Sequence, residues 1–181
     1  MITTTHIVTN ALVNRRWPGL LPSPRWFVAG GLAPDVGLTV MSVGAAIVLP
    51  RTRGVSRDEA LRIGFEDLFF NSKPWIAASN VFHSPVVLGA LLLASTTMSG
   101  AKADRLRSFA LGAALHTAMD VPVHVDDGPV LLWPLNWNYR FESAFSYWDR
   151  DHFGGWIAPV DIGVTVLGGA SLLRSFLKNR R

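Results

Sequence analysis

Cysteine is absent from the 181-residue sequence, which excludes disulfide scaffolds and cysteine-ligated metal sites. Charged side chains are scarce, at 17% of residues compared with about 25% in an ordinary soluble domain. There is no low-complexity run, and the 49% apolar content, with 7 Trp and 10 Phe, is too high for a disordered chain. These features disfavour a water-soluble enzyme and indicate a single domain with much apolar surface to cover.

Long apolar segments are the main feature of the sequence. The segment Pro74 to Ala101 has His83 as its only titratable side chain. At 1.5 Å per residue it is long enough to cross a hydrocarbon layer of about 30 Å. Further candidates are Trp26 to Leu49, Trp156 to Leu177 and Arg107 to Val125. The sequence therefore predicts an all-α polytopic membrane protein with about four transmembrane helices, and a soluble bundle of buried helices is the alternative.

Two shorter helices accompany the predicted spans. One is a short N-terminal helix that carries His6. The other runs from Ser56 to Phe70 and is amphipathic, and Ser56 is expected to cap it with Glu59 three residues on. Because no internal repeat or linker is evident, residues 1–181 are treated as one integral membrane domain, with the amphipathic helix in an outer loop.

The distribution of Lys and Arg predicts the orientation. Four spans place ten basic residues on the side of the two termini and seven on the other side. The positive-inside rule then predicts a multi-pass protein of the bacterial inner (cell) membrane with both termini in the cytoplasm. The same distribution accounts for the net charge of +4 without a nucleic-acid partner, so the lipid bilayer is the expected partner. The ten residues are Arg15, Arg16, Arg25, Lys102, Arg105, Arg107, Arg174, Lys178, Arg180 and Arg181.

Asp35 and Asp120 lie well inside predicted spans, where an unpaired charge costs several kcal/mol, whereas Asp161 lies within a turn of its span's boundary at Trp156. Asp35 follows a Gly30-Gly31-Leu-Ala-Pro34 stretch that is expected to break its helix. Asp120 lies four residues after His116, so both side chains point from one helical face. Measured from the basic side, Asp35 and His116 lie about 14 Å deep, and Asp120 about 20 Å deep. Their neighbouring depths allow one internal polar cluster.

Imidazole and carboxylate side chains at such a cluster suit a divalent ion of the zinc or manganese/iron type, because no thiolate is available. His83 lies further out, at about 23 Å. His6 joins the cluster only if the N-terminal helix folds back on the bundle. His124, Asp126 and Asp127 follow on the outer side, where a cavity is expected to open.

The segment from His116 to Asp149 is the most distinctive part of the chain. It contains His116-Thr-Ala-Met-Asp120-Val-Pro-Val-His124-Val-Asp126-Asp127-Gly128, and later Trp133-Pro134, Arg140-Phe141 and Ser146-Tyr147-Trp148-Asp149. Together with Thr5-His6, Pro34-Asp35 and the Asn80 to Ser84 stretch, it resembles a family of bacterial inner-membrane proteins described as metal-dependent hydrolases. These are the YdjM-like, LexA-binding inner-membrane group, and the resemblance spans most of the chain.

The resemblance implies a four-span protein with a metal site built from four ligands, His6, Asp35, His116 and Asp120, with His83 close by. The chain departs from the YdjM-like pattern at Val36-Gly37-Leu38, where a second acid and a His are expected. A further His is replaced around Ala78 and Ser79. One metal ion is therefore expected rather than two.

The leading hypothesis is a membrane-embedded metal-dependent hydrolase that acts on an ester or phosphoester of a lipid or envelope molecule. In it, His124, Asp126 or Asp127 orients the ligands or handles protons during catalysis. The alternative is a non-catalytic accessory or assembly subunit of a membrane protein complex, with other subunits as partners and the polar cluster holding the bundle together. A transporter or proton relay is a third reading.

Overall fold

The computed structural model describes residues 1–179 and confirms an all-helical chain. Within these residues, the only strand-type pairing is an isolated bridge between Val130 and Arg140. The elements are α1 (Thr3–Arg16), α2 (Pro24–Arg53), α3 (Arg57–Ile63), the π-helical turn η1 (Gly64–Leu68), α4 (Phe69–Asn71), α5 (Lys73–Asn80), α6 (Pro85–Thr96), α7 (Gly100–Asp120), the 3-10 turns η2 (Val121–Val123) and η3 (Arg150–His152), and α8 (Gly154–Lys178).

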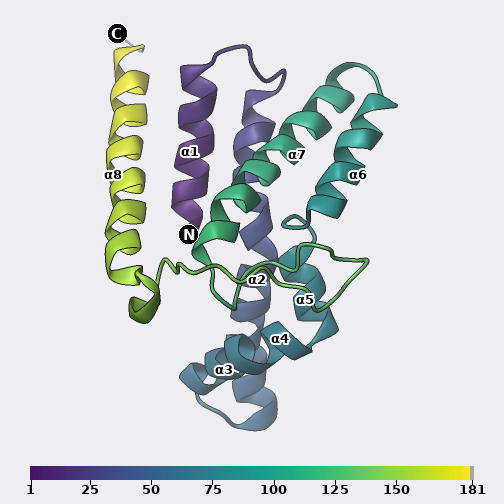
Figure 1. Cartoon of the computed structure of the whole chain (residues 1–181), viewed down its shortest axis with the longest axis vertical. Helices are drawn as coiled ribbons and strands as arrows, with labels where there is room; N and C mark the ends of the chain where they lie inside the picture. Colours follow the sequence, from purple (N-terminus) through teal and green to yellow (C-terminus); the bar gives the residue numbers. More distant parts are fainter. Residues whose placement is uncertain (180–181) are drawn as a thin grey trace.

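Helix α2 is the central element, and the other helices are arranged along its length (Figure 1). Helices α1 and α7 pack against α2, α8 packs against α1, and α6 packs against α7, whereas α3, α4 and α5 lie around the second half of α2. The long segment between α7 and α8 crosses the middle of the molecule. The N-terminus also lies in the middle. Helices α1 and α8 both finish at the upper end of the bundle in this view.

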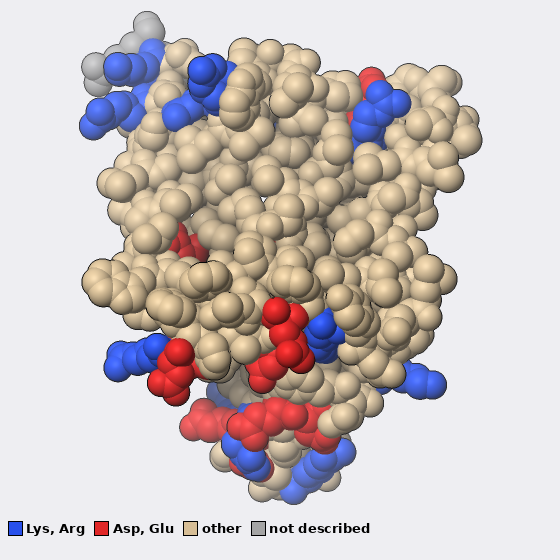
Figure 2. Space-filling view, in the orientation of Figure 1, with Lys and Arg blue, Asp and Glu red and all other residues tan. Residues whose placement is uncertain are grey.

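Charged side chains gather at the two ends of the molecule, and an almost uncharged band separates them (Figure 2). We call the end where α1 and α8 finish and α2 and α7 begin the basic end. We call the other part of the molecule, from the segment 121–153 down to α3 and α4 in this view, the loop end. Eight of the ten basic residues that the sequence assigns to one side lie on elements at the basic end. Arg180 and Arg181 lie outside the described residues.

The prediction of about four transmembrane helices is not supported. Two helices, α2 and α8, are long and apolar enough to cross a membrane, and the count rises to three if α5 and α6 form one bent span. Helix α7 covers the fourth predicted span only from Arg107 to Asp120, where the helix ends. This helical stretch is shorter than the roughly 20 residues that a hydrocarbon layer requires.

The apolar segment 74–101 is not one straight helix as predicted. Helix α5 ends at Asn80, α6 begins at Pro85, and the two meet at an angle of 50°. Pro85 has no N–H to continue a helix, and the Ser84 side chain caps α6 by accepting a hydrogen bond from the Val86 N–H at 3.2 Å. The Ser84 hydroxyl also contacts the Leu131 carbonyl at 3.1 Å, which ties the break to the segment 121–153.

The break expected at residues 30–34 does not occur, because α2 continues through Pro34. Pro34 is buried, and α7 packs against the same part of α2. Gly112 allows this contact, since a Cβ there would lie only 2.0 Å from the Phe27 carbonyl oxygen. Close backbone packing of this kind is typical of membrane helix pairs with small residues at the interface. The packing of α7 supports α2 near Pro34, a residue that would otherwise weaken the helix.

The amphipathic helix predicted over Ser56 to Phe70 is confirmed as a helical run through α3, η1 and α4. Ser56 caps it, and its Oγ accepts a hydrogen bond from the Glu59 N–H at 3.1 Å. The apolar face packs on the second half of α2 in a core of Ala45, Leu49, Ala60, Phe69 and Trp75. The packing places the phenylalanines of η1 and α4 beside the segment 121–153.

Candidate metal centre

Four side chains from three parts of the chain converge at the middle of the bundle. Asp35 comes from α2, His83 from the break between α5 and α6, and His116 and Asp120 from α7. Each offers one nitrogen or oxygen atom, and these atoms all lie within 4.8 Å of one another. In the part of the chain that the structure describes, this is the one group of three or more side chains arranged to hold a metal ion.

The distances within the group are those of ligands around a common centre. His116 Nε2 lies 3.2 Å from Asp120 Oδ2 and 3.5 Å from Asp35 Oδ1. His83 Nε2 lies 3.4 Å from the same Asp120 oxygen and 3.9 Å from the same Asp35 oxygen. Two imidazoles thus face two carboxylates across one small space.

Backbone carbonyls determine which ring nitrogens of the two histidines face the group. His116 Nδ1 lies 2.8 Å from the Gly31 carbonyl oxygen, and His83 Nδ1 lies 2.6 Å from the Ser79 carbonyl oxygen. Because a carbonyl only accepts hydrogen bonds, each Nδ1 carries the hydrogen and donates it. The Nε2 atoms of the neutral rings then present lone pairs to each other, 3.2 Å apart. Second-layer hydrogen bonds of this type orient metal-ligating histidines.

An unpartnered polar atom supports the fit of a cation. Asp35 Oδ2 is buried and has no hydrogen-bond partner among the described residues. Burial of such groups without compensation is costly, and two lone pairs facing two carboxylates add repulsion. A bound divalent ion would remove both costs. The donor set of imidazoles and carboxylates suits zinc, manganese or iron.

His6 reaches the group because α1 folds back beside α2 and α7, as required for it to join the cluster. Its ring stacks on that of His116, with 3.6 Å between centroids, and its Nε2 lies 3.0 Å from Asp120 Oδ1. The Met1 amino group also contacts this oxygen, at 2.8 Å. Asp120 thus directs Oδ1 towards the start of the chain and Oδ2 towards His83 and His116.

His124 and Asp127 lie beside the group, on its loop-end side. His124 Nε2 is 3.6 Å from Asp120 Oδ1, and His124 Nδ1 is 2.9 Å from Asp127 Oδ1. The Trp148 indole N–H donates to Asp127 Oδ2 at 3.0 Å. Although burial disfavours its charged form, the hydrogen bonds from His124 and Trp148 hold the pKa of the Asp127 carboxyl below its usual range.

A cavity of about 50 Å³ opens between the ligands and the His124–Asp127 pair, and Asp35, His83 and Asp120 line it. This volume admits an ion together with water. A larger groove of about 430 Å³ adjoins it at the loop end. Tyr147 lines that groove, and burial together with nearby carboxylates raises the pKa of its phenol to about 12, so it is protonated at neutral pH.

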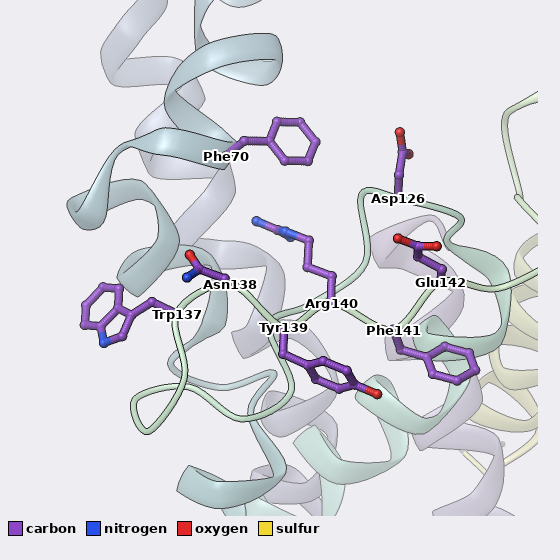
Figure 3. A pocket seen from close by; sticks show the side chains of 8 residues that line it. All are labelled: Phe70, Asp126, Trp137, Asn138, Tyr139, Arg140, Phe141 and Glu142. Atoms are coloured by element: carbon purple, nitrogen blue, oxygen red, sulfur yellow. The ribbon is translucent and has the colours of Figure 1, made fainter.

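The structure brings the four predicted ligands His6, Asp35, His116 and Asp120 close together, but the group arranged to hold an ion contains His83 in place of His6. It differs from the prediction at His83, which was expected further out in a supporting position and instead lies level with His116. The reason is the break after α5, which the Ser84-Pro85 pair indicates. The predicted depth of His83 assumes one straight helix without this break. Asp126 lies apart from the cluster, in an outer pocket that it shares with Arg140 (Figure 3).

The carbonyls of Gly31 and Ser79, which orient the two histidines, were not predicted. Carbonyl roles leave no signature in side-chain chemistry, so no sequence signal identifies them. Trp148 was also missed as the partner of Asp127.

No family model, curated protein or solved structure matches the chain.

Proposed function

We propose that this chain is a membrane-embedded hydrolase that uses one divalent ion of zinc, manganese or iron held by Asp35, His83, His116 and Asp120. The observation that carries the proposal is the convergence of two oriented Nε2 atoms and two carboxylates at a buried cavity. Such an ion lowers the pKa of a bound water molecule and polarises the bond to be cleaved. His6, which is buried against His116 and Asp120, keeps the space around the ligands closed to water.

The His124–Asp127 pair is placed to handle protons in this reaction. Asp127 accepts from His124 Nδ1 and so turns Nε2 towards Asp120 Oδ1 and the Met1 amino group, which lie 3.6 Å and 3.4 Å away. Trp148 donates to the other Asp127 oxygen. In hydrolysis of an ester, the water oxygen bonds to the acyl carbon or phosphorus, and the alcohol oxygen leaves with a proton. His124 takes the proton that the water loses and returns it to the leaving oxygen.

Metal content and hydrolysis of model substrates test the proposal. The protein purified in detergent is expected to retain about one divalent ion per chain. It is expected to cleave p-nitrophenyl octanoate or bis-p-nitrophenyl phosphate in a reaction that a chelator stops and added metal restores. The measurements are elemental analysis and release of p-nitrophenol. Absence of bound metal, or turnover that survives chelation, would contradict a metal-dependent hydrolase.

A comparison of His124 with a second histidine, His152, makes this test more specific. His152 forms the same type of contact as His124, with Nδ1 2.7 Å from Asp149 Oδ2, but it lies on the surface. We expect His124→Gln to keep the metal and to lower kcat by about 100-fold or more, whereas His152→Gln changes neither. Equal effects of the two substitutions would exclude His124 as the proton carrier.

The proposal includes a membrane orientation in which the basic end faces the cytoplasm of a bacterial cell. Side chains on α2 and α8 such as Val40 and Leu167 are 62% and 73% exposed, as expected for helices that contact lipid. The basic end carries more Lys and Arg than the loop end. The positive-inside rule therefore places the basic end in the cytoplasm.

Single cysteines test this orientation, because the chain has none of its own. In spheroplasts, Asp58→Cys and Asn138→Cys at the loop end are expected to react with an impermeant maleimide. Ser99→Cys at the basic end is expected to react only after lysis, and the cysteine-free chain is the control. Labelling of Ser99→Cys in intact spheroplasts, with the other two protected, would reverse the orientation.

An accessory subunit of a membrane complex is the second candidate. Trp156 on α8 is 80% exposed, and this apolar face would suit a neighbouring membrane chain as well as lipid. In that case the purified protein would hold no metal and would co-purify with other membrane chains in fixed stoichiometry.

A further inference from the structure

The groove beside the cavity has a strongly aromatic lining. Its volume of about 430 Å³ falls within the range of small-molecule sites, about 300 to 1,000 Å³. It lies between the second half of α2, the π-helical turn η1 with α4, and the segment 121–153. We call it the aromatic groove, and its apolar and aromatic walls are Leu38, Phe65, Phe69, Phe70, Tyr147 and Trp148.

The aromatic groove and the metal cavity are continuous. Leu38, Phe69, His124 and Asp127 line both spaces. A molecule in the groove therefore meets the His124–Asp127 pair at its inner end. Phe65 and Trp148, which also line the groove, are 46% and 58% exposed, so the groove opens at the surface through aromatic side chains.

The charges around the groove disfavour an anionic ligand. Glu66, Asp126 and Asp127 line it, whereas its lining includes no Lys or Arg among the described residues. The basic residue of the neighbouring pocket, Arg140, is engaged elsewhere (Figure 3). Its guanidinium group lies over the Phe69 ring, 4.5 Å from the centroid, and donates to the carbonyls of Gly128 and Phe69. Along the groove walls, away from the proposed ion, a phosphate or carboxylate would thus meet carboxylates without a partner cation.

We infer that the substrate is an uncharged carboxylic ester with one long acyl chain, supplied by the membrane, and that the chain lies in the aromatic groove. The inference rests on the proposed hydrolase and selects a carboxylic ester over a phosphoester. The apolar walls take the hydrocarbon, and the ester group lies at the His124–Asp127 end. Hydrolysis then joins the water oxygen to the acyl carbon and releases the alcohol, leaving a fatty acid.

Photolabelling tests the inference independently of turnover. The full chain is placed in nanodiscs of phosphatidylethanolamine and phosphatidylglycerol with a monoacylglycerol whose acyl chain carries a diazirine. Adducts are then mapped by mass spectrometry. We expect labelling of residues 65–70 and 147–148, in protein with and without metal. Lysophosphatidate with the same chain is expected to label these residues at least tenfold less, because it differs by its phosphate.

Two matched variants identify the groove. Phe65→Asp adds a charge to the groove wall and is expected to lower labelling of residues 147–148 at least tenfold. Phe141→Asp makes the same change in the neighbouring pocket, at a side chain of similar exposure, and is expected to leave the labelling unchanged. Equal metal content in both variants shows that the cluster is intact, and p-nitrophenyl acetate reports turnover that does not need the groove.

The outcomes separate the two proposals. Adducts confined to the lipid-facing sides of α2 and α8, or equal labelling by the two probes, overturn the acyl-ester inference even when metal-dependent turnover persists. Unchanged labelling in Phe65→Asp overturns it as well. Groove labelling in a protein that never holds metal overturns the hydrolase instead.

Discussion

Asp120→Asn is expected to lower the affinity for a divalent ion by at least about 100-fold, the largest effect of any single isosteric change in this chain. Asp120 Oδ2 lies 3.2 Å from His116 Nε2 and 3.4 Å from His83 Nε2. The amide keeps the shape but removes the negative charge that a hard cation requires. Loss of a hydrogen bond that only orients a ligand costs 10- to 100-fold, and loss of a ligand costs more.

Titration of the purified variant with zinc or manganese in competition with a chelator measures this affinity. Asp149→Asn is the matched control, because Asp149 also pairs with a histidine, His152, but this pair lies at the surface and outside the ligand group. Similar affinities for wild type and Asp120→Asn would remove Asp120 from the ligand set. A loss caused equally by both substitutions would point to general destabilisation.

Gly37→Ala is expected to produce the largest loss of stability. A Cβ at this position on α2 would lie 1.8 Å from the Ala78 carbonyl oxygen on α5, so the two helices must separate. Overpacking typically lowers the free energy of unfolding by about 1 to 3 kcal/mol. A backbone contact this short is expected to cause a loss at the upper limit of this range. For a chain of this size, about 3 kcal/mol lowers the melting temperature by roughly 6 to 12 °C.

Thermal unfolding of Gly37→Ala is compared with that of Gly44→Ala on the same helix, where a Cβ meets nothing within 4 Å. The control is expected to melt at or slightly above the wild-type temperature, because Ala is the better helix former. Gly37→Ala also moves α5, whose Ser79 carbonyl orients His83, so its metal affinity should fall as well. Equal melting temperatures for the two variants would contradict the close approach of α2 and α5.

The helical content and much of the candidate site follow from local patterns. Apolar runs predict the helices, and the Ser56–Glu59 spacing predicts the capped amphipathic helix. The four-residue spacing of His116 and Asp120 places both side chains on one face of α7. Asp35 could be assigned to the same cluster because a lone carboxylate in an apolar helix requires a partner. These inferences use only helix periodicity and the cost of burying charge.

Other features depend on contacts between distant segments. His83 joins the ligands only because α6 turns away from α5 by 50°, and a depth count along one straight helix places it too far out. The carbonyls of Gly31 and Ser79 orient the two histidines. The aromatic groove requires the amphipathic helix to pack beside the segment 121–153.

Periodicity and hydropathy are enough to predict a helical, apolar chain with imidazoles and carboxylates at matching depths. They do not predict which of these side chains share one centre, which ring nitrogens face it or what kind of groove leads to it. Both patterns act over one or two helical turns. The angle between helices and the choice of hydrogen-bond acceptor are set instead by close packing between residues that lie far apart in the sequence.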